Sequence, residues 1–373
     1  MSKIKKIIFF HPSIESGGVE KNLFTSINNL NKKNYKIIFI TYSRIKNKKI
    51  ENKVEIIYPK FNFIKSKRFL KIFLCFFSLI IFNFFKRIPI ISFQANIFAI
   101  IASIITRSKI IVRTNATPDF YIHSNFSKKF FSFFFSKANL ILVSSKQFQG
   151  RFKKFFNLKS EILRHQLNFQ DIKKKSNIKN KFNFFDDKKI LKIISVGRLV
   201  DQKDYITLLK AFSILIKKRK AKLVIIGNGN KKLEIFNFIK KNNLNKIVKI
   251  FNFKKNPFNF IKKANIFVMS SKFEGTPNIL LETAVLKKLI ISTDCNTGPK
   301  EILQNGKGGI LFTVGDYKGL SNILINIDLK NNRNLSMIKR TYLYVKKNYN
   351  ADNTNNFIKF LTKEKLYQVK LNA

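Results

Sequence analysis

Cysteine and histidine are scarce in this sequence, which limits the chemistry that it can support. Cys75 and Cys295 are its only cysteines, and the 373 residues include three histidines. Two cysteines cannot be assigned to a disulfide from sequence, and with three histidines they form no metal-binding cluster. We therefore expect no metal centre and a compartment in which thiols stay reduced, the cytoplasm.

The sequence also lacks a full G-x-G-x-x-G motif, a fixed-period repeat and a signal peptide. Its first residues, MSKIKKIIFFHP, hold an apolar run that is too short for a signal peptide and is needed as a first β-strand. Without the glycine motif, nothing favours binding of NAD. No period recurs along the chain.

Acidic residues are few: 20 Asp and Glu stand against 73 Lys and Arg, and the formal net charge is +53. Such a charge, with aromatic residues between the lysines, would suit nucleic acid. The lysines, however, are spread over the whole chain and accompany 42 phenylalanines and many Ile and Asn, as codons of an AT-rich genome would produce. We expect no nucleic-acid partner. An anionic membrane surface remains, because each Lys near it contributes about 1 kcal/mol of attraction.

One apolar segment, FLKIFLCFFSLIIFNFF at residues 69–85, is long enough to suggest a membrane span. It contains Lys71 and two further polar residues, and the segment after it divides into a strand at 88–93 and a helix at 96–105. An α/β domain requires helix, strand and helix at this place, so we expect a core or surface helix at 69–85. The alternative is a helix that enters a membrane interface.

Strand and helix patterns alternate along the chain, which predicts parallel sheets with helices on both faces. The length fits two domains, each with its own core. Residues 165–189 turn polar and basic without a long apolar period, and we interpret them as a linker. The predicted segments are an N-terminal domain at 1–170, a C-terminal domain at 186–345 and terminal helices at 346–373.

Two glutamates mark the most informative segment. Glu274 and Glu282 are separated by seven residues around a Gly-Thr-Pro turn, after an apolar run at 264–269 that is typical of a buried strand. Helical spacing begins at Asn278. In open α/β sheets ligands bind at the carboxyl ends of strands, a helix start favours a phosphate, and a carboxylate accepts hydrogen bonds from sugar hydroxyls. The segment suits a sugar nucleotide, although the two acids could serve only the helix dipole.

Two earlier strand ends point to the same edge. One strand ends at Gly197, and Arg198 and Lys203 follow it, where a guanidinium and an ammonium could neutralise a diphosphate. The alternative is two solvated charges. The next strand ends at Gly227 and Gly229, which could let the backbone approach a ligand or could form an ordinary turn.

Together these segments resemble glycosyltransferase family 4, the retaining enzymes of the GT-B fold. The E-x7-E pattern with its Gly-Thr-Pro-Asn insert is the signature of that family. The matching blocks, in the order of the family, are GRLVDQK (197–203), IGNGNKKLE (226–234), ANIFVMSSKFEGTPNILLE (264–282), STDCNTGPKEIL (292–303) and GGILFTVGD (308–316). The resemblance implies an α/β protein with two Rossmann-like domains, whose parallel sheets face each other across a cleft. It also implies that the C-terminal helices pack back toward the first domain.

The resemblance assigns roles to single residues. Arg198 and Lys203 would hold the donor diphosphate, and Glu274 would lie near the donor sugar; these three are the implied catalytic residues. Glu282 would bond the nucleotide ribose. The other residues implied to line the donor site are Gly17, Gly18, Gly197, Gly227, Gly275, Thr276, Pro277 and Asn278.

The chain departs from the family in its N-terminal half. Where many relatives carry a histidine after the fourth strand, this chain reads KIIVRTNATPDFYIH. Arg113, Asn115 and His123 are therefore only candidate acceptor contacts. No Asp-x-Asp pair occurs, so the metal-bridged diphosphate chemistry of the other large glycosyltransferase fold has no obvious ligands here. We expect activity without a metal or any other cofactor.

Our hypothesis is a cytoplasmic retaining enzyme, peripheral to the inner face of the cytoplasmic membrane. It would move a hexosyl or N-acetylhexosaminyl group from a nucleotide donor, UDP-linked, to a glycan or lipid-linked saccharide. Front-face attack is expected, with the departing diphosphate helping to deprotonate the acceptor. Two other classes remain open. One is another GT-B enzyme, such as a nucleotide-sugar epimerase or a pyridoxal-dependent phosphorylase; the other is a basic module that binds membrane or nucleic acid without catalysis.

Overall fold

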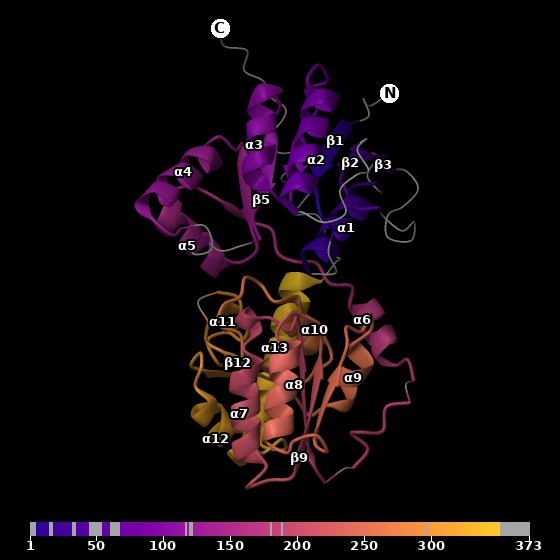
Figure 1. Ribbon diagram of the computed structural model, residues 1–373, viewed down its shortest axis with the longest axis vertical. Helices are drawn as coiled ribbons and strands as arrows, with labels where there is room; N and C mark the ends of the chain where they lie inside the picture. The colour runs from indigo at the N-terminus through magenta and orange to yellow at the C-terminus, as the bar shows by residue number, and fades with distance from the viewer. Residues whose placement is uncertain are drawn as a thin grey trace. The chain divides into compact units, whose positions relative to one another are not determined.

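The chain folds as two α/β units, the first extending to Gln166 and the second beginning at Leu167 (Figure 1). This computed structural model describes residues 5–14, 18–31, 35–44, 54–59, 68–115, 118, 122–179, 181–187, 189–295 and 297–350.

A seven-stranded parallel sheet with the order β3-β2-β1-β4-β5-β6-β7 organises the first unit. Its strands are β1 (Lys5–Phe10), β2 (Tyr35–Ile40), β3 (Val54–Ile57), β4 (Ile90–Ser92), β5 (Ile110–Arg113), β6 (Leu140–Val143) and β7 (Glu161–Ile162). Its helices are α1 (Gly18–Asn31), α2 (Arg68–Asn83), α3 (Asn96–Ile105), α4 (Asn125–Ser136) and α5 (Lys146–Phe156). This is the alternation of strands and helices that the sequence predicts.

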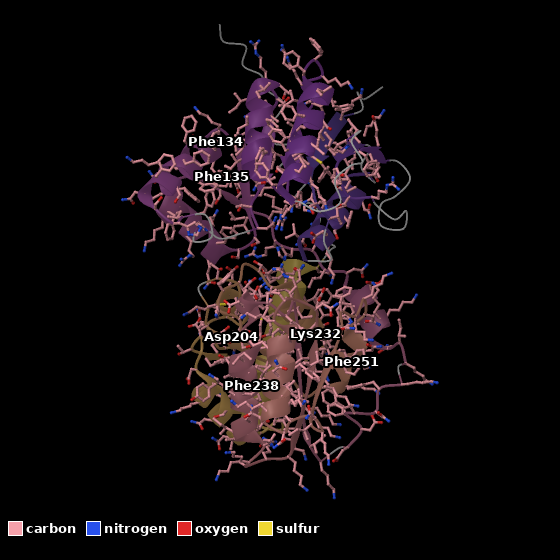
Figure 2. The ribbon with its side chains drawn as sticks, in the orientation of Figure 1. Phe134, Phe135, Asp204, Lys232, Phe238 and Phe251 are labelled. Carbon is pink, nitrogen blue, oxygen red and sulfur yellow. The ribbon has the colours of Figure 1, made fainter. Side chains whose placement is uncertain are left out.

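Strand β1 shows why this sheet needs helices on both faces. Its side chains alternate between two cores, with Ile7 and Phe9 in one and Ile8 and Phe10 in the other. Helix α1 closes the first core, and α2, α3, α4 and α5 close the second. In α4, the neighbours Phe134 and Phe135 (Figure 2) are half-buried and fully buried respectively, and the ring of Phe135 packs on Phe152 of α5.

The second unit repeats this plan with six parallel strands in the order β10-β9-β8-β11-β12-β13. The strands are β8 (Leu191–Val196), β9 (Ala221–Ile226), β10 (Val248–Phe251), β11 (Ile266–Met269), β12 (Leu289–Thr293) and β13 (Ile310–Phe312). The helices are α6 (Phe169–Ser176), η2 (Asp201–Lys203, a 3-10 turn), α7 (Tyr205–Leu215), α8 (Lys232–Lys241), α9 (Phe258–Lys263), α10 (Asn278–Val285), α11 (Pro299–Ile302), α12 (Tyr317–Asn326) and α13 (Asn332–Tyr349). Helices α7, α8 and α12 cover one face, and α6, α9, α10 and α13 cover the other.

The strand order reverses once in each sheet, between β1 and β4 and between β8 and β11. At such a switch point, the helices that follow the two neighbouring strands leave toward opposite faces of the sheet. The loops at the carboxyl ends therefore diverge and leave a crevice, which is where ligands bind in sheets of this kind.

The helix expected at 69–85 is α2, and the helix expected at 96–105 is α3. Helix α2 buries Cys75, Leu79 and Asn83 and exposes its other side. In the part of the chain that the structure describes, no helix is both long and apolar enough to span a bilayer.

The stretch at 165–189, interpreted as a linker, folds differently. It contains α6, and its Phe169, Ile172, Phe182 and Phe185 are buried in the second unit. The lysines between these apolar residues hide their period in the sequence. The expectation that 346–373 packs toward the first domain concerns mostly residues 351–373, which lie outside the described residues; α13 itself packs on α10 and β12 of the second unit.

Candidate functional site

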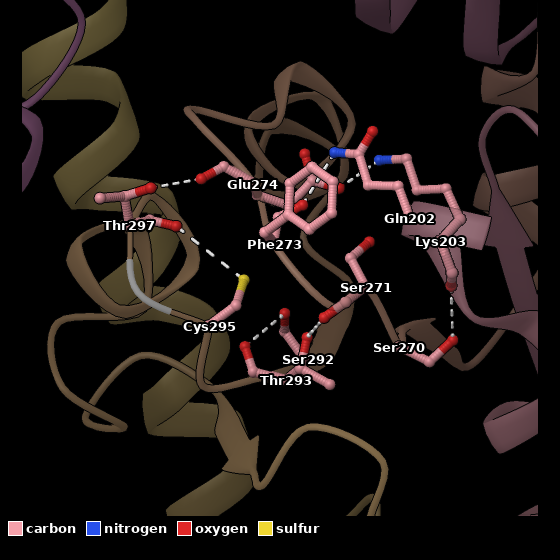
Figure 3. A network of polar contacts seen from close by, with 10 residues as sticks. All are labelled: Gln202, Lys203, Ser270, Ser271, Phe273, Glu274, Ser292, Thr293, Cys295 and Thr297. Carbon is pink, nitrogen blue, oxygen red and sulfur yellow. Dashed lines mark hydrogen bonds and ion pairs between the residues drawn. The ribbon is translucent and has the colours of Figure 1, made fainter. Parts of the chain in front are cut away.

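An ion pair between Lys203 and Glu274 lies at the switch point of the second sheet (Figure 3). Lys203 ends η2, in the loop after β8, and Glu274 lies in the loop after β11. The two side chains are 14% and 8% exposed, so the pair is largely removed from water. The structure thus brings together two residues that the sequence assigned to one site.

Hydrogen bonds to backbone carbonyls hold together the two loops that carry this pair. Gln202 Nε2 donates to the carbonyl of Phe273 at 2.8 Å, and the amide of Lys272 donates to the carbonyl of Gln202 at 2.8 Å. Ser270 Oγ shares its proton between the carbonyl oxygens of Lys203 and Asp204, at 3.0 and 2.8 Å. Sequence reasoning did not select Gln202 or Ser270, whose contacts depend on β8 and β11 being neighbours in the sheet.

The loop after β12 supports Glu274 from a third direction. Thr297 Oγ1 donates to the carbonyl of Glu274, and Thr293 Oγ1 donates to that of Ser271 at 2.7 Å (Figure 3). Gly298 has a φ of +82°, and a Cβ there would lie 1.8 Å from the carbonyl oxygen of Gly275. Glycine is therefore required at 298 for conformation and for space. Thr297 and Gly298 lie in the STDCNTGPKEIL block, which was the signal available in the sequence.

Glu282 lies on the second turn of α10 and is 4% exposed. Gly275 and Thr276 are half-buried between the two glutamates, Pro277 is buried, and Asn278 begins α10. The N-cap residue, Pro277, offers no side-chain hydrogen bond to this helix start. The positive end of the helix dipole is therefore directed at the loop that holds Glu274.

The charge of Glu274 affects two buried neighbours. Burial, and then the Glu274 carboxylate, raise the pKa of Cys295 to about 12. Burial chiefly raises the pKa of the Tyr205 hydroxyl, with a smaller contribution from Glu274, against a hydrogen bond with Ser195 that lowers it. Both groups stay protonated at neutral pH, so neither supplies a base.

Arg198 is exposed in the loop after β8, and no residue that the structure describes accepts a hydrogen bond from its side chain. Gly197 and Gly227 have a different part. A Cβ at Gly227 would lie 1.8 Å from the carbonyl oxygen of Gly197, and one at Gly229 would lie 2.1 Å from that of Leu199. These glycines let the loops after β8 and β9 come into contact. The close backbone approach that they permit is therefore between two segments of the chain.

The sequence-predicted residues of the first unit are not gathered in this way. Gly17 lies outside the described residues, and Gly18 begins α1. Asn115 Nδ2 donates to the carbonyl of Phe93 at 3.0 Å, His123 is exposed near the start of α4, and Arg113 is buried at the end of β5.

Sequence reasoning missed His11 in this unit. It lies just after β1 and is 1% exposed, with Nε2 3.7 Å from Glu20 Oε1. Its position at the end of the strand was the available signal.

The match to a known protein family lies within the second unit. Residues 174–344 match the family described as Glycosyl transferases group 1. An uncharacterized glycosyltransferase of Methanocaldococcus jannaschii is 35% identical over 181 residues, 46% of this chain and 44% of that protein. The N-acetylgalactosamine-N,N'-diacetylbacillosaminyl-diphospho-undecaprenol 4-alpha-N-acetylgalactosaminyltransferase of Campylobacter jejuni is 29% identical over 259 residues, 65% of this chain and 66% of that protein. The matches thus span less than two thirds of these curated relatives.

Solved structures match the whole fold. The Anabaena protein HepE in complex with UDP and glucose has a TM-score of 0.78 at 14% identity, over 96% of this chain and 99% of that one. A glycosyltransferase from Rickettsia africae has a TM-score of 0.78 at 17% identity, over 98% and 99%. At this identity the likeness concerns the fold alone, and it confirms the predicted GT-B class of two Rossmann-like α/β domains with parallel sheets.

Proposed function

We propose, because residues 174–344 match the family described as Glycosyl transferases group 1, that the chain belongs to this family and is a retaining glycosyltransferase. The donor is a UDP-linked hexose or N-acetylhexosamine, and the acceptor is a glycan or a lipid-linked saccharide. The observation that carries this proposal is the Lys203–Glu274 pair at the switch point between β8 and β11.

The ion pair defines where the donor diphosphate would bind. In the free protein Glu274 neutralises Lys203, whereas Arg198 is exposed and offers its guanidinium to an incoming phosphate. A bound diphosphate would compete with Glu274 for Lys203 and leave the carboxylate facing the sugar. As the bond from sugar to diphosphate breaks, negative charge grows on the leaving group. Donors already in place, Arg198, Lys203 and the start of α10, would stabilise that charge, and such electrostatic stabilisation usually lowers the barrier more than any other single effect.

A panel of nucleotide sugars tests this function. Purified protein is incubated with UDP-, GDP- and ADP-linked sugars, first for thermal stabilisation and then with a diphosphate-linked saccharide acceptor for product formation. We expect stabilisation by UDP-sugars, release of UDP only with acceptor, and an anomeric configuration that NMR shows to be retained. Interconversion of the sugar without acceptor would instead indicate an epimerase. No response to any nucleotide sugar would contradict the assignment.

A second element of the proposal is a membrane-facing surface on the first unit, which we define by the exposed apolar residues of α2 and α4. Phe69, Phe73, Phe77 and Ile81 follow one another every fourth residue along α2 and are 40–78% exposed. On α4 the exposed large apolar residues are Phe126, Phe130 and Phe133. Helix α3 packs between α2 and α4, so these side chains share one side of the sheet (Figure 1).

Charge complements this apolar surface. Lys71, Lys86, Lys128 and Lys129 lie on or beside the same helices, and Asp119 is the only acidic residue between Glu55 and Glu161. Phenylalanine beside lysine is the composition of segments that lie in a membrane interface. We place the protein in the cytoplasm, peripheral to the inner face of the membrane, where a lipid-linked acceptor would be within reach.

Vesicle binding tests this surface. We expect binding to vesicles of anionic phospholipid that weakens as salt rises, because exposed charges are screened beyond about 8 Å at physiological ionic strength. The double variant Phe77→Ser, Phe126→Ser should lose most of the binding. Leu233→Ser is the matched control, since Leu233 is 76% exposed on α8 of the second unit. Equal loss in the control, or no binding at low salt, would remove the membrane from the proposal.

A further inference from the structure

The second unit contains a cavity of about 880 Å³ between α13 and residues 300–311. The cationic side chains that line it are Lys300, Lys307, Arg333 and Arg340, and Asp294 is the one carboxylate among its described lining residues. Lys300 Nζ donates to Asp294 Oδ2 at 2.9 Å, so this carboxylate already has a cation as its partner. Lys307, Arg333 and Arg340 are exposed and form no ion pair with a described residue. The cavity therefore has a surplus of positive charge that an anionic ligand would neutralise.

Helix α13 supplies one wall of this cavity. Arg333, Met337 and Arg340 stand at positions i, i+4 and i+7, so they share one face of the helix. A rise of about 1.5 Å per residue places Arg333 and Arg340 about 10 Å apart along the helix axis. A guanidinium binds a phosphate through two parallel hydrogen bonds. Two guanidiniums that start two turns apart favour a ligand with two separate phosphate groups over a ligand with one.

The turn at residues 304–309 supplies the opposite wall and is held against α13. Its Gln304, Asn305 and Gly306 have φ values of +51°, +56° and +86°. Thr341 Oγ1, on α13, donates to the carbonyl of Gly308, and a Cβ at Gly308 would lie 2.1 Å from that hydroxyl oxygen. Because this contact joins the turn to the helix, both walls are in place before a ligand binds.

The cavity also has an apolar part. Ile310 and Leu311 of β13 are half-buried there, and Met337 is buried. Small-molecule sites have volumes of about 300–1,000 Å³ and combine apolar side chains with a few polar groups that orient the ligand. A concave site of this size suits a small organic molecule, whereas an acidic protein or a lipid surface would need a broad, open face.

We propose that this cavity binds a small organic molecule that carries two phosphate groups, a sugar bisphosphate being the simplest example. Arg333 and Arg340 bind the phosphates, Lys307 adds to the positive field, and the apolar part packs on the carbon skeleton of the ligand. The site is separate from the Lys203–Glu274 pair, because none of its lining residues belongs to the loops after β8 and β11. It does not depend on the glycosyl transfer proposed above.

Calorimetry with glucose 1,6-bisphosphate tests the site on the full-length protein, with glucose 6-phosphate as the matched ligand that has one phosphate. We expect one saturable site for the bisphosphate and binding of the monophosphate that is about tenfold weaker, since one charge-assisted contact is lost. The double variant Arg333→Gln, Arg340→Gln should weaken the bisphosphate about tenfold or more. The variant Lys240→Gln, Lys241→Gln removes the same charge from exposed positions at the end of α8 and should bind as the native protein does.

Arg198→Ala separates this site from the proposed donor site, and it should leave bisphosphate binding unchanged. Hydrogen exchange should slow in residues 304–311 and in α13 when the bisphosphate is added, because a ligand suppresses local opening of the elements that it contacts. Equal weakening in the Arg333, Arg340 and Lys240, Lys241 variants would show a response to net charge alone and overturn the proposal. Loss of binding in Arg198→Ala, equal affinity for the two sugar phosphates, or no saturable binding would also overturn it. A failure to bind UDP would count against the glycosyl transfer and leave these outcomes as they are.

Discussion

Both sheets have a switch point, but the charged side chains of the two units differ in whether they are paired. In the second unit, Lys203 and Glu274 neutralise each other, and two neighbouring loops support the loop of Glu274. In the first unit, Arg113 is buried without a described partner, and His11 lies 3.7 Å from Glu20 without a hydrogen bond to any described residue. A site whose charges are paired can stay folded when no ligand is bound. The described residues of the first unit give the charge of Arg113 no such partner.

The strongest way to break the second site is to disturb its support. We expect Gly298→Ala to lower the free energy of unfolding by about 3 kcal/mol, since the added Cβ meets the Gly275 carbonyl and an L-residue is disfavoured at positive φ. Gly315 is the matched control: its φ is +80°, but nothing lies within 4 Å of an added Cβ. Gly315→Ala should cost only about 1 kcal/mol. Chemical denaturation measures both; equal costs would show that the contact with Gly275 is unimportant.

Replacing the two cationic side chains tests the proposed diphosphate site directly. Arg198→Ala and Lys203→Ala should each lower kcat about a hundredfold, as the loss of a transition-state donor does. Arg198→Ala should leave stability unchanged. Lys203→Ala should also destabilise the fold, because it leaves Glu274 buried and unpaired.

Lys272→Ala is the control for both variants. Lys272 pairs with Asp201 at 2.8 Å in the same two loops, but 42% of its side chain is exposed, so its loss should cost less than about 1 kcal/mol and spare kcat. Steady-state kinetics and denaturation on the three variants separate the roles. Near-normal kcat in Arg198→Ala and Lys203→Ala would remove both from the site.

Substitutions of the two glutamates should have smaller effects, and these should differ between the two positions. Glu282→Ala should weaken UDP binding about tenfold through the lost ribose contact. Glu274→Ala should spare or improve UDP binding, because Lys203 is then free for the phosphate, and should instead lower transfer, as an interaction made mainly in the transition state does. Calorimetry with UDP, beside transfer assays, measures both. The reverse pattern would exchange the two roles.

Metal removal should have the smallest effect. In the proposed mechanism, Lys203, Arg198 and the start of α10 would supply the positive charge that a divalent ion would otherwise bring to the diphosphate. We expect kcat with EDTA to stay within about twofold of kcat with magnesium, a difference of less than about 0.5 kcal/mol in the barrier. A larger loss, restored by magnesium or manganese, would show that the cationic side chains are insufficient.

Particular segments and residues show what could be predicted from the sequence and what could not. Helices α2 and α3 were found because their apolar residues are dense and continuous. The stretch at 165–189 was misread, because lysines separate the phenylalanines that α6 and the segment after it bury. Ser270 and Gln202 were missed because serine and glutamine are common in loops, and nothing local indicates which carbonyl they will meet.

By itself, the sequence determined the α/β alternation, and its motifs carried the family resemblance that singled out Arg198, Lys203, Glu274 and Glu282, because these depend on local periodicity and motif spacing. The tertiary structure decided what the residues touch. Lys203 and Glu274 are 71 positions apart and meet because β11 inserts beside β8, a pairing between strands that are not consecutive in the chain. The same physics left Arg113 buried at the end of β5, since the burial and partners of a charge are set by the elements packed around it.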